Sequence, residues 1–113
     1  ARVIRPEQRA LYHAAASMAS NYLIALEGAA ERLAQAVGLD REALVPLVRA
    51  TIEQWASLGA RDALTGPIVR GDEETVARQR DAVAAAAPDL LPLWDALATA
   101  TRSLATLPSA ART

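Results

Sequence analysis

Polar side chains near the start of the chain recur at helical spacing and could meet a substrate on one face. His13, Ser17 and Asn21 follow one another at steps of four residues, and Ser20 lies within the same arc. Histidine transfers protons near neutral pH, while hydroxyl and amide groups orient a carbonyl or carboxylate by hydrogen bonding. These residues could line one wall of a cleft. Spacing alone favours the alternative, a solvated face or a helix contact in which these groups satisfy one another.

A second polar segment, LTGPIVRGD at residues 64–72, contains glycines that permit close backbone approach. Arg61 and Arg70 could pair there with a carboxylate or a phosphate. The simpler interpretation is structural, since Gly66-Pro67 forms turns and Asp72 suits a helix N-cap. Taken alone, the segment favours the interpretation as a turn over that as an anion-binding site.

The sequence lacks the residues that most other kinds of catalytic or binding site require. The chain has no cysteine for thiol catalysis or thiolate metal sites, and its single histidine argues against a zinc or iron centre. It contains no glycine-rich phosphate loop, zinc-protease motif or serine-hydrolase motif. The formal net charge of -1 gives no reason to expect nucleic acid or an anionic membrane. The longest uncharged stretch, residues 10–26, is short for a membrane span, and no signal peptide is visible. We therefore expect a cytoplasmic protein.

The elements that carry these residues are all predicted to be helical. No segment shows the alternation that a strand needs. Helix-capping and helix-breaking residues predict a first helix from Pro6 to Gly38 and a second from Asp40 to Gly59. Residues 59–72 are predicted to form a loop with one helical turn. A third helix is predicted from Asp72 to Ala86, and a last one from Pro88 to before Pro108. Pro46 predicts either a kink in the second helix or a new helix start.

Apolar residues at steps of three and four predict which helix faces are buried. The first helix carries such a stripe at Leu11, Ala15, Met18, Tyr22, Leu26, Ala29, Leu33 and Val37, and the second carries one at Leu44, Leu47, Val48, Thr51, Trp55 and Leu58. We expect the first helix to be the spine on which the others pack. The predicted fold class is all-α, a helical bundle around one long N-terminal helix.

Two motifs together resemble a known family: YHAAASMASNYL at residues 12–23 and ALTGPIVRGD at residues 63–72. They resemble the helical C-terminal domain that follows a Rossmann-like domain in a bacterial group of NADP-dependent oxidoreductases, long described as a domain of unknown function. The resemblance covers Pro6 to about Leu104. The group is similar in architecture to ketopantoate reductase, pyrroline-5-carboxylate reductase and the 6-phosphogluconate dehydrogenase C-terminal domain.

The resemblance implies which residues meet the substrate. Better-known relatives use a lysine on a helix of this half as proton donor, and this chain contains no lysine. His13 then becomes the expected acid, with Asn21 orienting the substrate and Arg70 binding its carboxylate. The expected catalytic residues are His13 and Asn21, and the expected substrate-binding residues are Ser17, Thr65, Gly66, Pro67 and Arg70.

The resemblance also implies partners and domain limits. NADP is expected to bind mainly to an N-terminal Rossmann domain absent from this chain, because no glycine-rich strand-to-helix turn occurs here. We expect residues 1–5 to be the remnant of an interdomain linker, 6–108 the substrate-binding and dimerisation domain, and 109–113 a disordered tail. The expected partners are a second copy, the Rossmann domain and an oxo acid or imine substrate, such as ketopantoate, with no nucleic acid and no membrane. The alternative is a non-catalytic helical dimerisation or interaction module.

Overall fold

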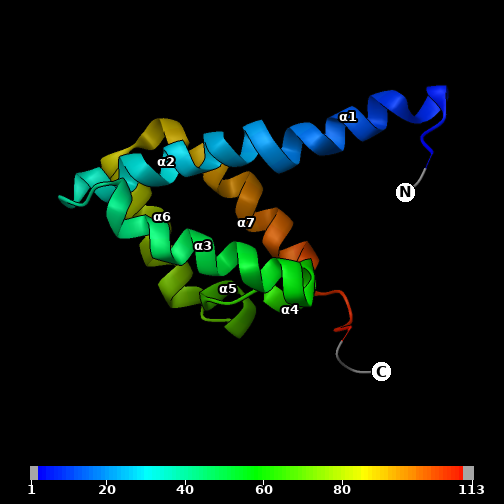
Figure 1. Ribbon diagram of the computed structural model, residues 1–113. Helices are drawn as coiled ribbons and strands as arrows, with labels where there is room; N and C mark the ends of the chain where they lie inside the picture. The colour runs from blue at the N-terminus through cyan, green and yellow to red at the C-terminus, as the bar shows by residue number, and fades with distance from the viewer. Residues whose placement is uncertain (1–2, 111–113) are drawn as a thin grey trace.

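A long helical segment opens the fold in the computed structural model, which describes residues 3–110 (Figure 1). It comprises a 3-10 turn η1 (Pro6–Gln8), helix α1 (Arg9–Ser17), a π-helical turn η2 (Met18–Tyr22) and helix α2 (Leu23–Ala36). No strand occurs among the described residues. The predicted all-α class and the long N-terminal helix are therefore confirmed, while the π-helical turn was not predicted.

The remaining helices begin and end close to the predicted residues. They are α3 (Arg41–Leu58), α4 (Ala60–Ala63), α5 (Pro67–Arg70), α6 (Glu73–Ala86), the 3-10 turn η3 (Pro88–Leu90) and α7 (Leu91–Ala105). Helix α3 runs through Pro46, so the alternative of a new start there is wrong. The segment 59–72 is more helical than predicted, because both α4 and α5 form within it. The predicted tail at 109–113 lies mostly outside the described residues, as does the start of the predicted linker at 1–5.

Local signals explain where these helices end. Gly38, at φ 82°, follows the long helix, and its N–H bonds the carbonyl of Gln35 at 3.0 Å. The N–H of Leu39 bonds the carbonyl of Ala34 at 3.0 Å, which completes a Schellman motif. The Asp72 carboxylate accepts from the backbone N–H of Thr75 at 3.2 Å and so caps α6 as predicted. Asp40 occupies the N-cap of α3 without a side-chain capping bond.

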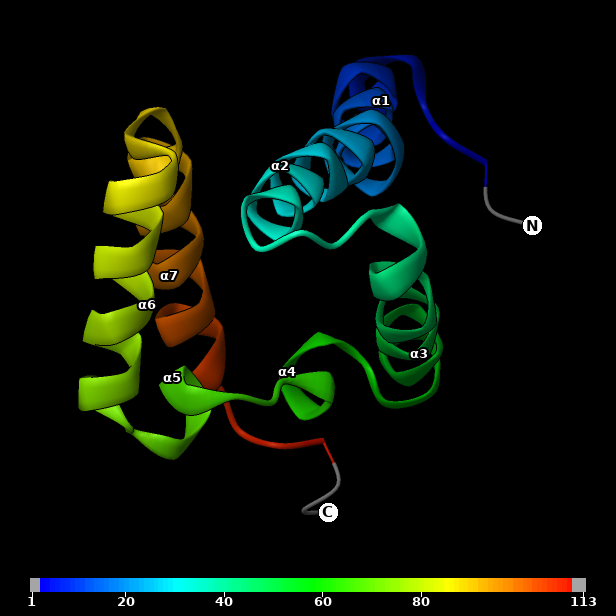
Figure 2. The same ribbon diagram turned by 90° about the vertical axis from the view of Figure 1, so that its left-hand side faces the viewer.

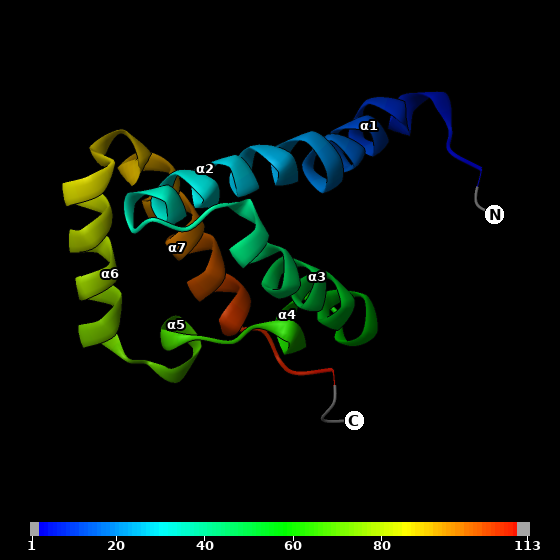
Figure 3. The ribbon, with the colours of Figure 1, turned by 60° about the vertical axis from the view of Figure 1, so that its left-hand side comes forward.

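The core lies where α2, α6 and α7 meet, and it is built from small side chains. The buried apolar residues are Ala34 on α2, Val76 and Val83 on α6, and Ala87 just after α6. Helices α6 and α7 run side by side in Figure 2, and α2 passes near one end of the pair in Figure 3. Small side chains let these helices approach closely, but they remove little apolar surface from water.

Three two-pronged arginine–carboxylate pairs tie the core helices together. Arg32 on α2 donates to Asp89 at 2.8 and 2.9 Å. Between α6 and α7, Arg80 donates to Asp95 at 2.9 and 2.8 Å, and Arg102 donates to Glu73 at 2.9 and 3.3 Å. The planar guanidinium suits this geometry, which a lysine could not make. The pairs are exposed to solvent, so they fix orientation more than they add stability.

The predicted role of the long helix as a spine is wrong for its first half. Helix α1 projects beyond the other helices (Figure 1), and Leu11, Met18 and Tyr22 are 76%, 69% and 65% exposed. Leu26 and Leu33, on α2, are half-buried. The stripe is apolar as predicted, but no other helix of residues 3–110 packs extensively against its N-terminal part.

Truncating the core tests this packing. Val83, which is 4% exposed, lies on the inner face of α6. We expect Val83→Ala to lower the free energy of unfolding by about 1–3 kcal/mol, because it removes buried methyl groups and leaves a cavity. Val37→Ala is the matched control, since Val37 is 74% exposed, and its effect should stay within about 0.5 kcal/mol. Urea titrations measure both. Equal losses would contradict the assigned core.

The ion pairs predict a pH dependence. Arg80 lowers the pKa of Asp95, mainly through its hydrogen bonds and also through its charge. A carboxylate with a lowered pKa stabilises the fold above its usual pKa, and that contribution is lost as pH falls through the folded-state value. Between about pH 7 and pH 3 the wild type should therefore lose more stability than Arg80→Gln, which lacks the pair. Thermal unfolding at the two pH values checks this. Equal losses of stability in the wild type and in Arg80→Gln would show that the Arg80–Asp95 pair does not contribute to the stability of the fold.

Candidate functional site

The polar residues of the long helix lie on its projecting part. His13 and Ser17 are on α1, and Asn21 is in the π-helical turn η2. His13 and Asn21 are exposed, Ser17 is half-buried, and none of the three hydrogen-bonds to another side chain among the described residues. The ring of His13 lies 5.7 Å from that of Tyr12, centroid to centroid. These groups are therefore open to a ligand or another chain.

The π-helical turn is the feature of this helix that sequence patterns did not predict. It spans Met18–Tyr22, between the α-helical segments. Within it, the Ser20 hydroxyl donates to the Ala16 carbonyl at 2.6 Å, one turn earlier. Single π turns inside α-helices often occur at functional sites. Here the turn includes Asn21 and changes the register between the two halves of the helix.

The second motif forms the connection between α4 and α6. Gly66 has φ 91° and ψ -175°, which strongly favours glycine, and Pro67 then begins α5. Gly71, at φ 71°, ends α5 in the left-handed conformation. Arg70, at the end of α5, is exposed and forms no ion pair among the described residues. Its charge contributes to a lowered pKa of Asp72, whose main cause is the hydrogen bond from the Thr75 hydroxyl.

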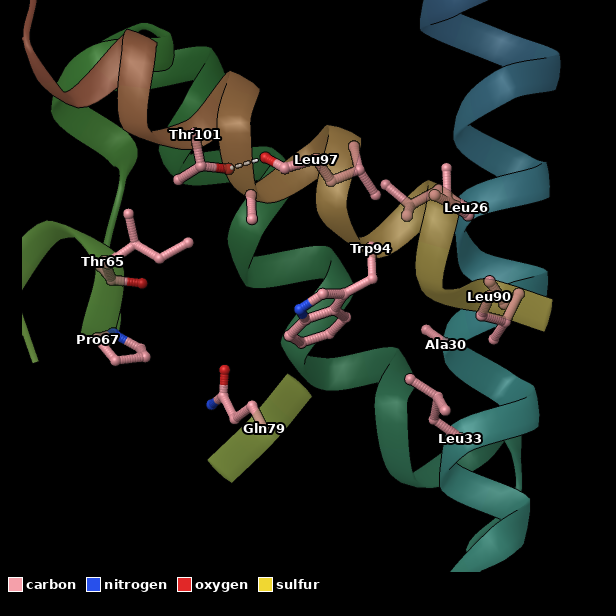
Figure 4. Close-up of a pocket in the computed structure, with 14 residues that line it drawn as sticks. Leu26, Ala30, Leu33, Thr65, Pro67, Gln79, Leu90, Trp94, Leu97 and Thr101 are labelled. Atoms are coloured by element: carbon pink, nitrogen blue, oxygen red, sulfur yellow. Dashed lines mark hydrogen bonds between the residues drawn. The ribbon is translucent and has the colours of Figure 1, made fainter. Parts of the chain in front are cut away.

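A cavity of about 260 Å³ lies between this connection, α2 and α7 (Figure 4). Its wall is apolar apart from Thr65, Gln79, Thr101 and the indole N–H of Trp94. The lining residues are Leu26, Ala29, Ala30, Leu33, Thr65, Pro67, Ile68, Gln79, Leu90, Leu93, Trp94, Leu97, Ala98 and Thr101. None is charged, so the cavity does not suit a carboxylate or a phosphate.

The fold brings only part of the predicted site together. Thr65 and Pro67 line the cavity, whereas His13, Ser17 and Asn21 do not. Figures 1 and 3 show α1 pointing away from α5, so within one copy the two motifs do not face a common cleft. Trp94 and Gln79 line the cavity without having been predicted. The pattern of the last helix did not distinguish Trp94 as a site residue, and nothing in the sequence singled out Gln79.

The described residues contain neither a metal-binding cluster nor a membrane-spanning helix. No group of His, Asp or Glu side chains there is arranged to hold a metal ion. No helix in this part of the chain combines the length and the apolar character needed to cross a membrane. Residues 3–110 also contain no strand-to-helix glycine turn of the kind that binds a nicotinamide pyrophosphate.

One family model matches the chain. It is described as a domain of unknown function (DUF2520), and it matches residues 1–101 of the 113. The matched region contains both sequence motifs and ends within α7. No curated protein and no solved structure matches the chain.

The glycines provide a test of the connection. A Cβ at Gly66 or at Gly28 would meet no atom within 4 Å, so only backbone conformation separates the two positions. We expect Gly66→Ala to destabilise the fold by about 1–3 kcal/mol, because its φ of 91° disfavours side chains. Gly28→Ala, inside α2, should stabilise it by about 0.5–1 kcal/mol. Denaturant unfolding of both variants measures the contrast. Equal stabilisation would contradict the assigned conformation of Gly66.

Proposed function

The chain belongs to the DUF2520 family, and we propose that it is the helical, substrate-binding and dimerisation half of an NADP-dependent oxidoreductase. The proposed substrate class is a 2-oxo acid, such as ketopantoate, or an imine. In this proposal a Rossmann domain of the same parent protein holds the cofactor. This chain supplies the groups that orient the substrate and move a proton.

Each proposed residue has a chemical role that suits its side chain. Reduction of a carbonyl places charge on its oxygen, and His13 as imidazolium would donate a proton to that atom. The Asn21 amide N–H and the Ser17 hydroxyl would hold the carbonyl by hydrogen bonds. Because the two motifs do not face a common cleft within one copy, Arg70, with Thr65 and the Gly66-Pro67 turn beside it, would pair with the carboxylate of a substrate held by the long helix of a second copy. The absence of lysine leaves His13 as the strongest acid candidate on this helix.

The observation that carries the proposal is the openness of the polar face. His13 and Asn21 are exposed, and neither side chain makes a hydrogen bond within residues 3–110. Polar residues that only joined two helices would satisfy one another instead. Their placement beside a π-helical turn further supports a ligand-facing role.

A second candidate function is a helical dimerisation or interaction module without catalysis. The large exposed apolar side chains on α1 and α3 favour it, because such surfaces commonly bind another chain. The two candidates share these apolar surfaces. They differ in whether the polar face contributes to a reaction.

Activity of the longer protein tests the proposal. The domain is expressed with its own upstream sequence, and NADPH oxidation is followed by absorbance with ketopantoate and related 2-oxo acids. His13→Ala is expected to lower kcat by about 100-fold or more, because general acid catalysis is lost. Gln35→Ala, at the far end of α2, is the control and should leave kcat unchanged. Absence of NADPH binding and turnover, or an unaffected His13→Ala enzyme, would support the interaction module instead.

A further inference from the structure

The apolar stripe of α3 is partly covered along its first half, where Leu47 is still 65% exposed, and open along its second. Leu44 and Val48 are half-buried beside α2, to which this end of the helix is also tied by an ion pair between Arg41 and Glu31 at 2.9 Å. Trp55 and Leu58, farther along the same stripe, are 55% and 53% exposed. Helix α3 packs against α2 and α4 and stands apart from α6 and α7 in Figure 2.

The stripe has a near-symmetric arrangement about Thr51. Leu44 and Leu58 lie seven residues on either side of it, and Leu47 and Trp55 lie four residues on either side. At helical spacing, Glu42, Arg49 and Glu53 lie on the opposite side of α3, so no charge interrupts the stripe. The Thr51 hydroxyl already donates to the Leu47 carbonyl at 2.8 Å, so its burial leaves no hydroxyl proton unpaired. An antiparallel copy of the helix therefore meets like surface with like surface.

The exposed area of the chain has the size that a second copy would cover. The solvent-accessible surface is 8650 Å², whereas a folded monomer of 11.9 kDa exposes about 6,000 Å². The radius of gyration is 16.3 Å, against about 13 Å for a globule of this length. The excess of roughly 2,600 Å² is at the upper end of what one subunit contributes to a large obligate dimer, about 1,000–2,500 Å². Interfaces between domains of one chain bury about 600–1,500 Å² in total, so a Rossmann domain alone would leave much of this excess exposed.

We propose that α3 is a self-association helix, which packs antiparallel against α3 of a second copy around a two-fold axis near Thr51. Each Leu47 then lies opposite the partner copy's Trp55, and the open half of each stripe is covered. A two-fold interface requires the same surface on both copies, and the symmetric stripe meets that requirement. This inference rests on the dimer included in the proposed function and identifies the helix that forms it.

Cysteine cross-linking tests the axis directly, since the chain contains no native cysteine. Thr51→Cys places two thiols across the proposed axis, where mild oxidation should join two copies in most of the protein. Ala50→Cys is the matched control, because it lies one residue away and points about 100° around the helix. It should cross-link at least about tenfold more slowly. Equal rates for the two variants, or no cross-link from Thr51→Cys in a dimeric protein, would overturn the proposal.

Sedimentation provides the second measurement. Trp55→Glu should weaken dimerisation by about 30-fold or more, the effect of removing an interface hot spot. Met18→Glu is the control on α1, where Met18 is 69% exposed, and it should leave the dimer intact.

If Met18→Glu dissociates the dimer and Trp55→Glu does not, α1 rather than α3 forms the interface, while the proposed function stands. If Trp55→Glu fails to fold, the cysteine result decides. A wild-type chain that remains monomeric at high concentration would reject this inference and the dimer, but NADPH turnover would still test catalysis separately.

Discussion

Close packing of small side chains between α2, α6 and α7 is the constraint on which the rest of the structure depends. Ala34, Val76, Val83 and Ala87 bring these helices together, but they bury little apolar area for a chain of this length. The large apolar side chains lie mostly outside this junction. A single copy is therefore held by a small core and leaves many large apolar side chains exposed to solvent.

The arginine–carboxylate pairs complement this core by fixing helix orientation at its edges. Arg32, Arg80 and Arg102 each reach a carboxylate on another element with two donors. A set of parallel two-pronged contacts restrains rotation and sliding of the helices, which small alanine and valine contacts do only weakly. An arginine-only basic composition thus suits a bundle whose interior lacks large interlocking side chains.

The sequence predicted helix type and most helix limits, because these depend on local signals. Gly38, Gly59 and Asp72 act within a few residues of themselves, and each marks a boundary in the structure. Burial was predicted less well. A periodic stripe shows that a helix face is apolar, but it does not show whether another part of the same chain covers that face. Leu33 is half-buried against its own chain, whereas Leu11 in the same stripe is exposed. The π-helical turn escaped prediction because it leaves no distinct pattern of polar and apolar residues.

The same limit applies to the candidate site. Spacing placed His13 and Ser17 on one helix and Gly66 in a turn, and both local assignments agree with the structure. Their separation is a tertiary property that no local spacing encodes. Because α1 points away from α5, a substrate that touched both motifs would need a surface from outside this copy (Figure 3). The small core and the divided candidate site therefore have the same physical origin, a projecting helix against which no other described helix packs.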